Sequence, residues 1–282
     1  MRAVFTCAHY SCRMTQRRNT SLAVLVVAIV VVLWRTLFPS GPGTSGGDAT
    51  TSGECGDKFA YGRITFTVQD PTTFLCRSQY AVLHDDARKV PLYSAEKLVG
   101  EDVDADVSRT EDFRPDEALP ASERAELNDY RGSGFDRGHM TPAADSDTPK
   151  EMSESFLLSN MVPQNGPMNQ GIWAGLEGAT RACAQQVGEI YVITGPVFEG
   201  NVRTIGDGVA VPSALYKIVL DAKSGDSRAF LMPNRSLRRS SDYAQYETTI
   251  DDVERRTNLD FFPQGSVDEA RRGTLCPQAY GS

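Results

Sequence analysis

Short runs of apolar residues recur along the chain at the length of β-strands. They are rich in Ile, Val, Leu and Tyr, which favour an extended backbone that packs on a half-buried surface. The runs predict strands at residues 64–68, 80–83, 190–194, 215–220 and 229–232. The polar residues 221–226 have the composition of a turn, so they join the last two strands into a hairpin. Residues 80–83 are likewise expected to pair with residues 91–93.

Helical patterns are fewer than strand patterns. Residues 168–186 contain no proline and space their apolar side chains broadly as a helix does. Thr249, followed by Asp252, resembles a capping box and predicts a short helix that ends near Arg256. Long helices between more numerous strands predict an α+β fold, with helices packed on a largely antiparallel sheet.

An uninterrupted apolar run, residues 22–34, precedes these elements, with arginines before it and Arg35 after it. Its thirteen residues fit a signal-peptide core, whereas a membrane span needs about 20. Residues 21–38 reach that length if Arg35 extends toward the headgroups. Because no A-x-A cleavage site follows, an uncleaved transmembrane anchor is slightly favoured. Either interpretation places the rest of the chain outside the cytoplasm, periplasmic or extracellular.

A mitochondrial presequence is the alternative, because the N-terminal segment is rich in arginine and free of acidic residues. Residues 1–20 thus form a basic segment and residues 21–38 the anchor or signal segment. Residues 39–54 are mainly Gly, Ser, Thr and Pro, which predicts a flexible linker. Residues 55–282 are long enough to bury a core and form the folded domain.

The charge is unevenly distributed. Residues 1–47 contain five arginines and no acidic residue, and the remaining 24 basic and 37 acidic residues give the rest of the chain a net charge of −13. Affinity for nucleic acid comes largely from phosphate neutralisation, so this balance argues against a tight DNA-binding module. It argues less against an enzyme whose basic residues converge in one cleft beside a divalent cation.

Four of the six cysteines lie in the folded domain, an even number in a compartment expected to be oxidising. Four cysteines allow three pairings. Proximity in sequence favours Cys55–Cys76, which leaves Cys183–Cys276.

The chain contains only three histidines. His9 precedes the apolar segment, and His84 ends a predicted strand beside two aspartates, where we expect a surface turn. His139 lies in residues 131–140 (RGSGFDRGHM), where three glycines allow the backbone to approach another group closely. This makes His139 the candidate for acid–base chemistry, with a histidine packed in a turn as the structural alternative.

A second polar cluster comprises residues 159–164 (SNMVPQ) and 169–177 (NQGIWAGLE). Asn169 and Glu177 lie two turns apart on the predicted helix and therefore share one of its faces. The amide oxygen of Asn169 suits a hard cation, and Glu177 can hold water around that cation. A solvated polar face with a Glu177–Arg181 ion pair is the structural alternative.

Together, the two clusters resemble the DNA/RNA non-specific endonuclease family, which includes secreted bacterial nucleases and mitochondrial nucleases of the endonuclease G type. Residues 129–135 (DYRGSGF), 191–198 (YVITGPVF) and 259–263 (LDFFP) share in the resemblance, which covers about residues 76–263. It implies the ββα-metal (His-Me finger) nuclease fold for residues 55–282. The acidic charge of this chain departs from the basic charge of several members.

The resemblance implies roles for individual residues. His139 matches the general base that deprotonates the attacking water, and Asn169 matches the direct protein ligand of one Mg²⁺, with Mn²⁺ as the alternative. Arg137 matches a phosphate-contacting arginine, and Arg109 matches a second one by spacing alone. Glu177 matches the carboxylate that orders water around the metal. Two further residues support the site, namely Asn160 beside the base and Asp136 as a brace of the motif.

The implied reaction is hydrolysis of DNA and RNA to products with 5′-phosphate ends. The partners are these substrates, the membrane if the N-terminal segment is retained, and, as further options, a second copy of the chain and an inhibitor protein. Two alternative functions stay open: a metal-dependent phosphodiesterase acting on small nucleotides, and a non-catalytic surface module that binds nucleic acid or protein.

Overall fold

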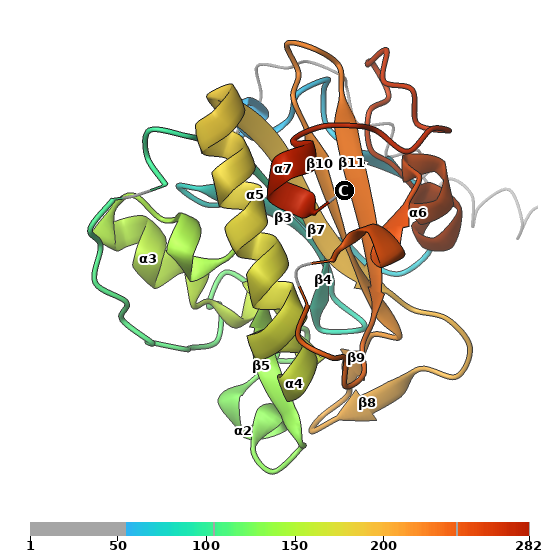
Figure 1. Ribbon diagram of the computed structural model, residues 1–282. Helices are drawn as coiled ribbons and strands as arrows, with labels where there is room; N and C mark the ends of the chain where they lie inside the picture. Colours follow the sequence, from blue (N-terminus) through green and yellow to red (C-terminus); the bar gives the residue numbers. More distant parts are fainter. Residues whose placement is uncertain (1–54, 104, 241, 282) are drawn as a thin grey trace, which may run out of the picture. The chain divides into compact units, whose positions relative to one another are not determined.

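The centre of the computed structural model, which describes residues 55–103, 105–240 and 242–281, is a seven-stranded sheet (Figure 1). Its strands, in spatial order, are β12 Glu247–Thr248, β11 Ser227–Pro233, β10 Ala214–Leu220, β7 Glu189–Val197, β4 Val90–Val99, β3 Tyr80–Asp85 and β2 Thr72–Cys76. All neighbouring strands are antiparallel. The predicted α+β fold with a largely antiparallel sheet is therefore confirmed.

Helices and two-stranded ladders are inserted between these strands. The α-helices are α2 Leu127–Tyr130, α3 Pro149–Ser155, α4 Gly166–Met168, α5 Ala174–Val187, α6 Ile250–Thr257 and α7 Pro277–Tyr280. Four 3-10 turns and one π-helical turn are η1 Gly56–Lys58, η2 Ala143–Asp145, η3 Leu158–Asn160, η5 Ala244–Tyr246 and the π turn η4 Asn169–Trp173. The ladders pair β1 Thr65–Phe66 with β13 Leu259–Asp260, β5 Phe135–His139 with β6 Met161–Asn165, and β8 Arg203–Ile205 with β9 Val209–Val211.

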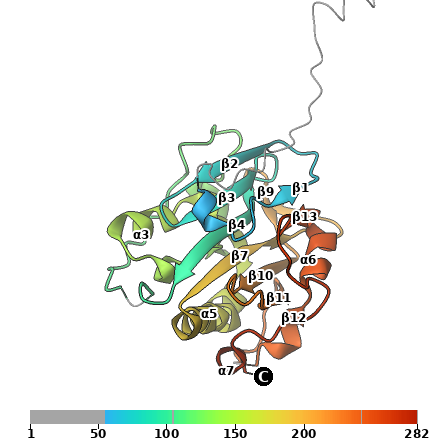
Figure 2. The ribbon, with the colours of Figure 1, turned by 90° about the horizontal axis from the view of Figure 1, so that it is seen from above.

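Both faces of the sheet are covered, which explains why its strands are apolar at successive positions. Val192 packs in one core with Trp173 and Leu176, from the π turn and α5. The next residue, Ile193, packs in a second core with Phe261 on the opposite face. Figure 2 shows α5 and α6 on opposite sides of the sheet, each covering one of these cores.

The apolar runs located β7, β10 and β11 well, but they located β4 only at residues 91–93 and the edges poorly. The predicted hairpin of residues 215–220 and 229–232 is present as β10 and β11, and residues 190–194 lie within β7. The predicted strand 64–68 shrinks to β1, which pairs outside the main sheet, because only Ile64 of this run is fully buried. The short strands β5 and β8 lack an apolar signal, since they form hairpins at the periphery rather than layers of the core.

The predicted helix at residues 168–186 is confirmed, although it begins with α4 and passes through the π turn before α5. Thr249 caps α6 as expected, accepting a hydrogen bond of 3.1 Å from the backbone N–H of Asp252. The reciprocal half of the capping box is missing, because the Asp252 carboxylate accepts from Thr248 and two arginines instead.

Both expected disulfides are present. Cys55 is bonded to Cys76 and Cys183 to Cys276, with Cα–Cα separations of 5.8 and 5.5 Å. The second disulfide ties α5 to the C-terminal segment beside α7. Among the described residues, no helix combines the length and apolarity needed to cross a membrane. The predicted anchor or signal segment, residues 21–38, lies outside them.

The expectation that His84 occupies a surface turn is wrong. Its side chain is fully buried on β3, and its Nδ1 lies 3.0 Å from Asp86 Oδ1. Asp85, the last residue of the strand, and Asp86 after it are buried as well, because Arg88 pairs with Asp85 and Thr73 donates to Asp86. Partners from neighbouring segments thus make a polar run compatible with burial.

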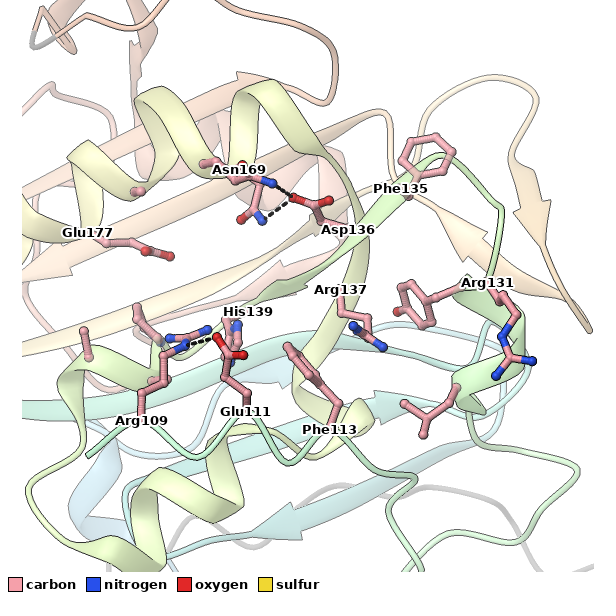
Figure 3. Close-up of a pocket in the computed structure, with 17 residues that line it drawn as sticks. Arg109, Glu111, Phe113, Arg131, Phe135, Asp136, Arg137, His139, Asn169 and Glu177 are labelled. Carbon is pink, nitrogen blue, oxygen red and sulfur yellow. Dashed lines mark hydrogen bonds and ion pairs between the residues drawn. The ribbon is translucent and has the colours of Figure 1, made fainter. Parts of the chain in front are cut away.

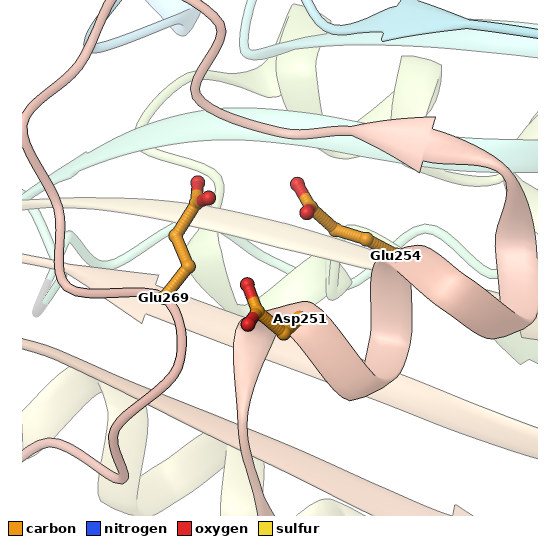
Figure 4. A group of neighbouring side chains, drawn as sticks. All are labelled: Asp251, Glu254 and Glu269. Carbon is orange, nitrogen blue, oxygen red and sulfur yellow. The ribbon is translucent and has the colours of Figure 1, made fainter.

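Three carboxylates, Asp251 and Glu254 on α6 and Glu269 in the following loop, gather on the face of the sheet opposite α5 (Figure 4). Burial raises the pKa of Glu269 to about 7, and the charges of Glu254, Asp260 and Asp251 add to the rise. A raised pKa means that the folded state binds this proton more tightly than the unfolded chain does. This group therefore stabilises the fold below about pH 4.5 and loses that contribution as the pH rises through 7.

We expect Glu269→Gln to raise the melting temperature at pH 8 by about 2–4 °C for each kcal/mol of repulsion that it removes. The gain should disappear near pH 4.5, where the wild-type carboxyl is already protonated. Calorimetry at the two pH values measures this, with Asp268→Asn as an exposed neighbouring control. A variant that is no more stable than wild type at pH 8 would contradict the electrostatic interpretation.

Candidate active site

A cavity of about 740 Å³ opens beside the β5–β6 hairpin, between the π turn and the loop that contains Glu111 (Figure 3). It brings together five of the six predicted site residues, which approach it from three separate segments. These residues are Arg109, Arg137, His139, Asn169 and Glu177. The sixth predicted residue, Asn160, is not among its lining residues.

The β5–β6 hairpin positions the histidine. His139 pairs with Met161 and Gly138 with Val162 in an antiparallel register. A Cβ at Gly138 would lie 2.0 Å from the side-chain oxygen of Gln164, a fully buried residue of the partner strand β6. The glycine before the histidine is therefore required by close packing of the two strands.

Two phenylalanines hold the imidazole of His139. The ring of Phe156 lies edge-on to it at 5.1 Å between centroids, and the ring of Phe113 lies at 5.8 Å. Burial lowers the pKa of His139 to about 3, and the positive charges of Arg109 and Arg137 contribute. His139 is therefore neutral at pH 7, which is the form that can accept a proton.

The two arginines lie on the outer faces of these same rings. The Arg137 guanidinium carbon is 4.1 Å from the centroid of Phe113, and that of Arg109 is 4.9 Å from the centroid of Phe156. Cation–π contact fixes each guanidinium at the cavity while leaving its N–H groups available for an anion. Arg109 also forms a long ion pair with Glu111, at 3.4 Å.

The π turn presents Asn169 to the cavity. In a regular α-helix, residues 169 and 177 would be offset by about 80° around the axis, since eight residues exceed two turns of 3.6. The wider π turn reduces this offset, and both side chains line the cavity. Such turns occur frequently at functional sites.

Asp136 orients Asn169. Its Oδ2 accepts hydrogen bonds from Asn169 Nδ2 at 3.0 Å and from Gln170 Nε2 at 2.8 Å. A carboxylate can only accept, so the amide nitrogen of Asn169 must face Asp136 and the amide oxygen is turned away from it. Asp136 itself lines the same cavity, on the strand that also contains His139 (Figure 3).

Glu177 is half-buried on α5. Burial raises its pKa to about 7, against the opposing charge of the fully buried Lys217. Its expected alternative partner Arg181 is bonded instead to Asp145, at 2.7 Å. A carboxylate whose ionisation is disfavoured in this way gains stability from a cation bound nearby.

The donors suit a divalent metal. The amide oxygen of Asn169 and the carboxylate of Glu177 both belong to the cavity lining, and hard cations such as Mg²⁺ bind oxygen ligands together with several waters. The arrangement fits a single ion held mainly by Asn169, with Glu177 available to order the water around it.

Asn160 lies behind the site. Its side chain is fully buried, accepts from the backbone N–H of Thr141 at 3.0 Å, and donates to the carbonyl oxygens of Thr141 and Ser155. These bonds fix the chain directly after His139. Its role as a supporting residue stays a prediction, but direct contact with substrate is inconsistent with this position.

The contacts of Phe113 and Phe156 with His139 were not predicted from the sequence. The two phenylalanines are far from His139 along the chain and carry no motif, so only the fold shows that they contact it. The pairing of Asp136 with Asn169 was also missed, although Asp136 was expected to brace the motif.

We expect Asp136→Ala to lower the activity of this site about 10–100-fold, the usual cost of losing a residue that orients a metal ligand. The substitution should have little further effect when Asn169 is already alanine, because both changes remove the same interaction. Initial rates of the two single variants and the double variant measure this. If the loss of activity in the double variant equals the product of the losses in the two single variants, Asp136 acts independently of Asn169.

Comparisons with known proteins agree with this geometry. Residues 60–268 match the family described as DNA/RNA non-specific endonuclease. Nuclease C1 of Cunninghamella echinulata var. echinulata is 35% identical over 232 residues, which cover 73% of this chain and 90% of that protein. Human mitochondrial endonuclease G is 35% identical over 224 residues, covering 73% and 74%. Mouse mitochondrial nuclease EXOG is 32% identical, and the matched region spans only 57% of it.

A solved structure also has this fold. It is described as the EndoG/EndoGI complex and the mechanism of EndoG inhibition, and it superposes with a TM-score of 0.69 at 29% identity. The superposition covers 77% of this chain and 94% of that one. The likeness thus includes nearly the whole of the neighbour.

Proposed function

This chain belongs to the DNA/RNA non-specific endonuclease family, and on that premise we propose that it is a metal-dependent endonuclease cleaving both DNA and RNA. The observation that carries the proposal is the convergence of His139, Asn169 and two arginines on one cavity. These groups supply a base, a metal ligand and phosphate contacts, which are the parts that phosphodiester hydrolysis requires.

In the proposed reaction, a ring nitrogen of His139 takes a proton from water as its oxygen attacks the phosphorus. The bond between phosphorus and the 3′ oxygen breaks, which leaves a 5′-phosphate and, after proton uptake, a 3′-hydroxyl. Arg137 and Arg109 hold the non-bridging oxygens, whose charge increases in the transition state. A Mg²⁺ or Mn²⁺ bound through Asn169 would stabilise charge on the phosphate and the leaving oxygen.

The proposed contacts recognise only the sugar–phosphate backbone of the nucleic acid. None of the assigned groups needs a base edge or the 2′-hydroxyl, so DNA and RNA are both acceptable substrates. The acidic composition argues against binding of nucleic acid. Arg109 and Arg137 offset it locally, because they concentrate positive charge where the phosphate must lie.

The test uses closed circular plasmid DNA, a structured RNA and a dinucleotide, each with Mg²⁺ and with EDTA. An endonuclease nicks the circle, degrades the RNA and leaves ends that polynucleotide kinase labels only after phosphatase treatment. Hydrolysis of the dinucleotide with both polymers intact would instead identify a phosphodiesterase of small nucleotides. Binding without cleavage of any substrate would identify a non-catalytic module.

The names of several relatives support the mitochondrial alternative for location, because EXOG, Nuclease 1 and endonuclease G are called mitochondrial. Export remains the competing proposal, since residues 1–54 lie outside the described part of the chain. N-terminal mass spectrometry of the native protein distinguishes a cleaved presequence or signal peptide from an uncleaved anchor. The neighbour in complex with EndoGI supports the proposal of an inhibitor protein as a partner, and homodimerisation stays a prediction.

A further inference from the structure

The cavity continues past the catalytic residues to an apolar end. Leu127 and Tyr130 line it together with Phe135 and Arg131, and Figure 3 shows Phe135 and Arg131 on the far side of Arg137 from His139. Leu127 is 37% exposed, and among the described residues only Phe66, which does not line this cavity, is a large apolar side chain exposed as much. These side chains give this end of the cavity an apolar lining beside its charged groups.

Phe135 is placed to act together with the catalytic strand. It begins β5, and Phe135, Arg137 and His139 of this strand all line the cavity. At about 3.3 Å per residue, Phe135 lies roughly 13 Å along the strand from His139. That distance places its ring beyond the nucleotide whose phosphate is cleaved.

Arginines without a carboxylate partner lie near this ring and along the same cavity. The Arg203 guanidinium carbon lies 5.3 Å from the centroid of Phe135, and Arg131 borders the cavity. Both arginines are exposed, and within the described ranges neither has an acidic partner, although most basic side chains of this acidic protein are paired. They are thus available for an anion.

The turn before Phe135 leaves room for a ligand. Gly132 and Gly134 have φ of +70° and +81°, and apart from their chain neighbours no atom lies within 4 Å of a Cβ built on either, so this turn faces open space.

We propose that Phe135 forms a stacking subsite for one unpaired nucleobase beyond the cleaved bond, at the end of the cavity that Leu127 also lines, with Arg131 and Arg203 contacting adjacent phosphates. The inference rests on the proposed nuclease function and names the substrate form that the site prefers. A base in a duplex has its faces covered by its neighbours, so the subsite favours single strands or locally opened duplexes. Stacking reads no base edge, so it adds affinity without sequence preference.

The experiment measures binding in EDTA, where no cleavage occurs. The full chain is titrated with fluorescent single-stranded oligonucleotides that each carry one abasic residue at a different position. We expect the loss of one base to weaken binding on the order of tenfold at a single position or a narrow run of positions. Phe135→Ala should weaken binding of the intact strand by a similar factor and remove the sensitivity to the abasic residue, whereas Phe135→Trp should retain both.

Matched controls separate stacking from general damage. Phe66→Ala removes an exposed apolar side chain outside the cavity and should leave binding unchanged. Arg203→Gln should reduce the slope of log Kd against the logarithm of salt concentration by about 0.7, the value for one lost phosphate contact. Arg272→Gln, which removes an exposed arginine elsewhere, should leave this slope unchanged.

The subsite is overturned if Phe135→Ala keeps the sensitivity of wild type to abasic residues, or if Phe66→Ala causes an equal loss. Failure of the nuclease proposal looks different. In that case position-dependent binding persists in EDTA, and Mg²⁺ produces no cleavage.

Discussion

Replacement of His139 by alanine is expected to lower the rate of phosphodiester cleavage by about 10²–10⁴-fold, the range that a positioned general base contributes. The fold should survive, because His139 is only partly buried and its aromatic neighbours also pack against each other. Single-turnover rates on a labelled single-stranded oligonucleotide measure the loss. His84→Gln, a change at the other described histidine, lies outside the cavity and should retain activity per folded molecule.

The pH dependence gives the same prediction a second readout. Because burial and two arginines lower the pKa of His139 to about 3, its neutral form should persist well below the usual histidine range. Wild-type activity should therefore show no loss from His139 protonation between pH 7 and 5. The contribution of His139 to the stability of the fold has the opposite pH trend to that of Glu269. It is present above about pH 6.5 and falls as the pH drops toward 3.

Removing the charge of Arg109 should raise the pKa of His139 and move any acid limb of the rate profile to higher pH. A His139→Ala variant that cleaves within a few-fold of wild type would contradict the assignment of the base. The assignment would also be contradicted if Arg109→Gln lowered the rate equally at every pH and left the acid limb of the profile at the same pH.

Asn169→Ala is expected to lower cleavage at least about 10²-fold, since it removes the proposed protein ligand of the metal and the charge stabilisation that depends on it. Metal affinity should fall in parallel, and calorimetric titration with Mg²⁺ and Mn²⁺ measures it without relying on catalysis. The variant should remain folded, because Asn169 is partly exposed and, in the described part of the chain, its side chain is hydrogen-bonded to Asp136 alone.

Gln170→Ala is the matched comparison for Asn169. Its amide donates to the same Asp136 oxygen and lies in the same cavity, but no metal role is assigned to it. A smaller loss with unchanged metal affinity is expected there. Equal effects of the two substitutions would mean that the pair serves the local fold, and that the metal is held by other groups.

How far the sequence predicted the fold depended on burial. The strands of the sheet centre are buried on both faces, so β7, β10 and β11 appear as continuous apolar runs. β5 was not recognisable as a strand, because its residues Phe135–His139 are selected for the cavity and for close packing at Gly138. Local composition carries no signal when function rather than core packing decides the residue.

The candidate site shows the same division. His139 and Asn169 were found because each stands in a compact motif, and the fold brings both to one cavity. The contacts of Phe113 and Phe156 with His139 depend on tertiary packing, which no local pattern encodes. His84 was misplaced for a related reason: polar neighbours indicate a turn unless distant partners satisfy them, and here Thr73 and Arg88 do so.

The most direct test of the central claim is the nicking of closed circular plasmid DNA by the full chain, followed in Mg²⁺ and in EDTA beside the His139→Ala variant. We predict rapid nicking and then degradation by wild type in Mg²⁺, no cleavage in EDTA, and a loss of at least about 10²-fold in the variant. An intact plasmid after prolonged incubation of folded wild-type protein with Mg²⁺ or Mn²⁺ would contradict the account, as would undiminished cleavage by the variant.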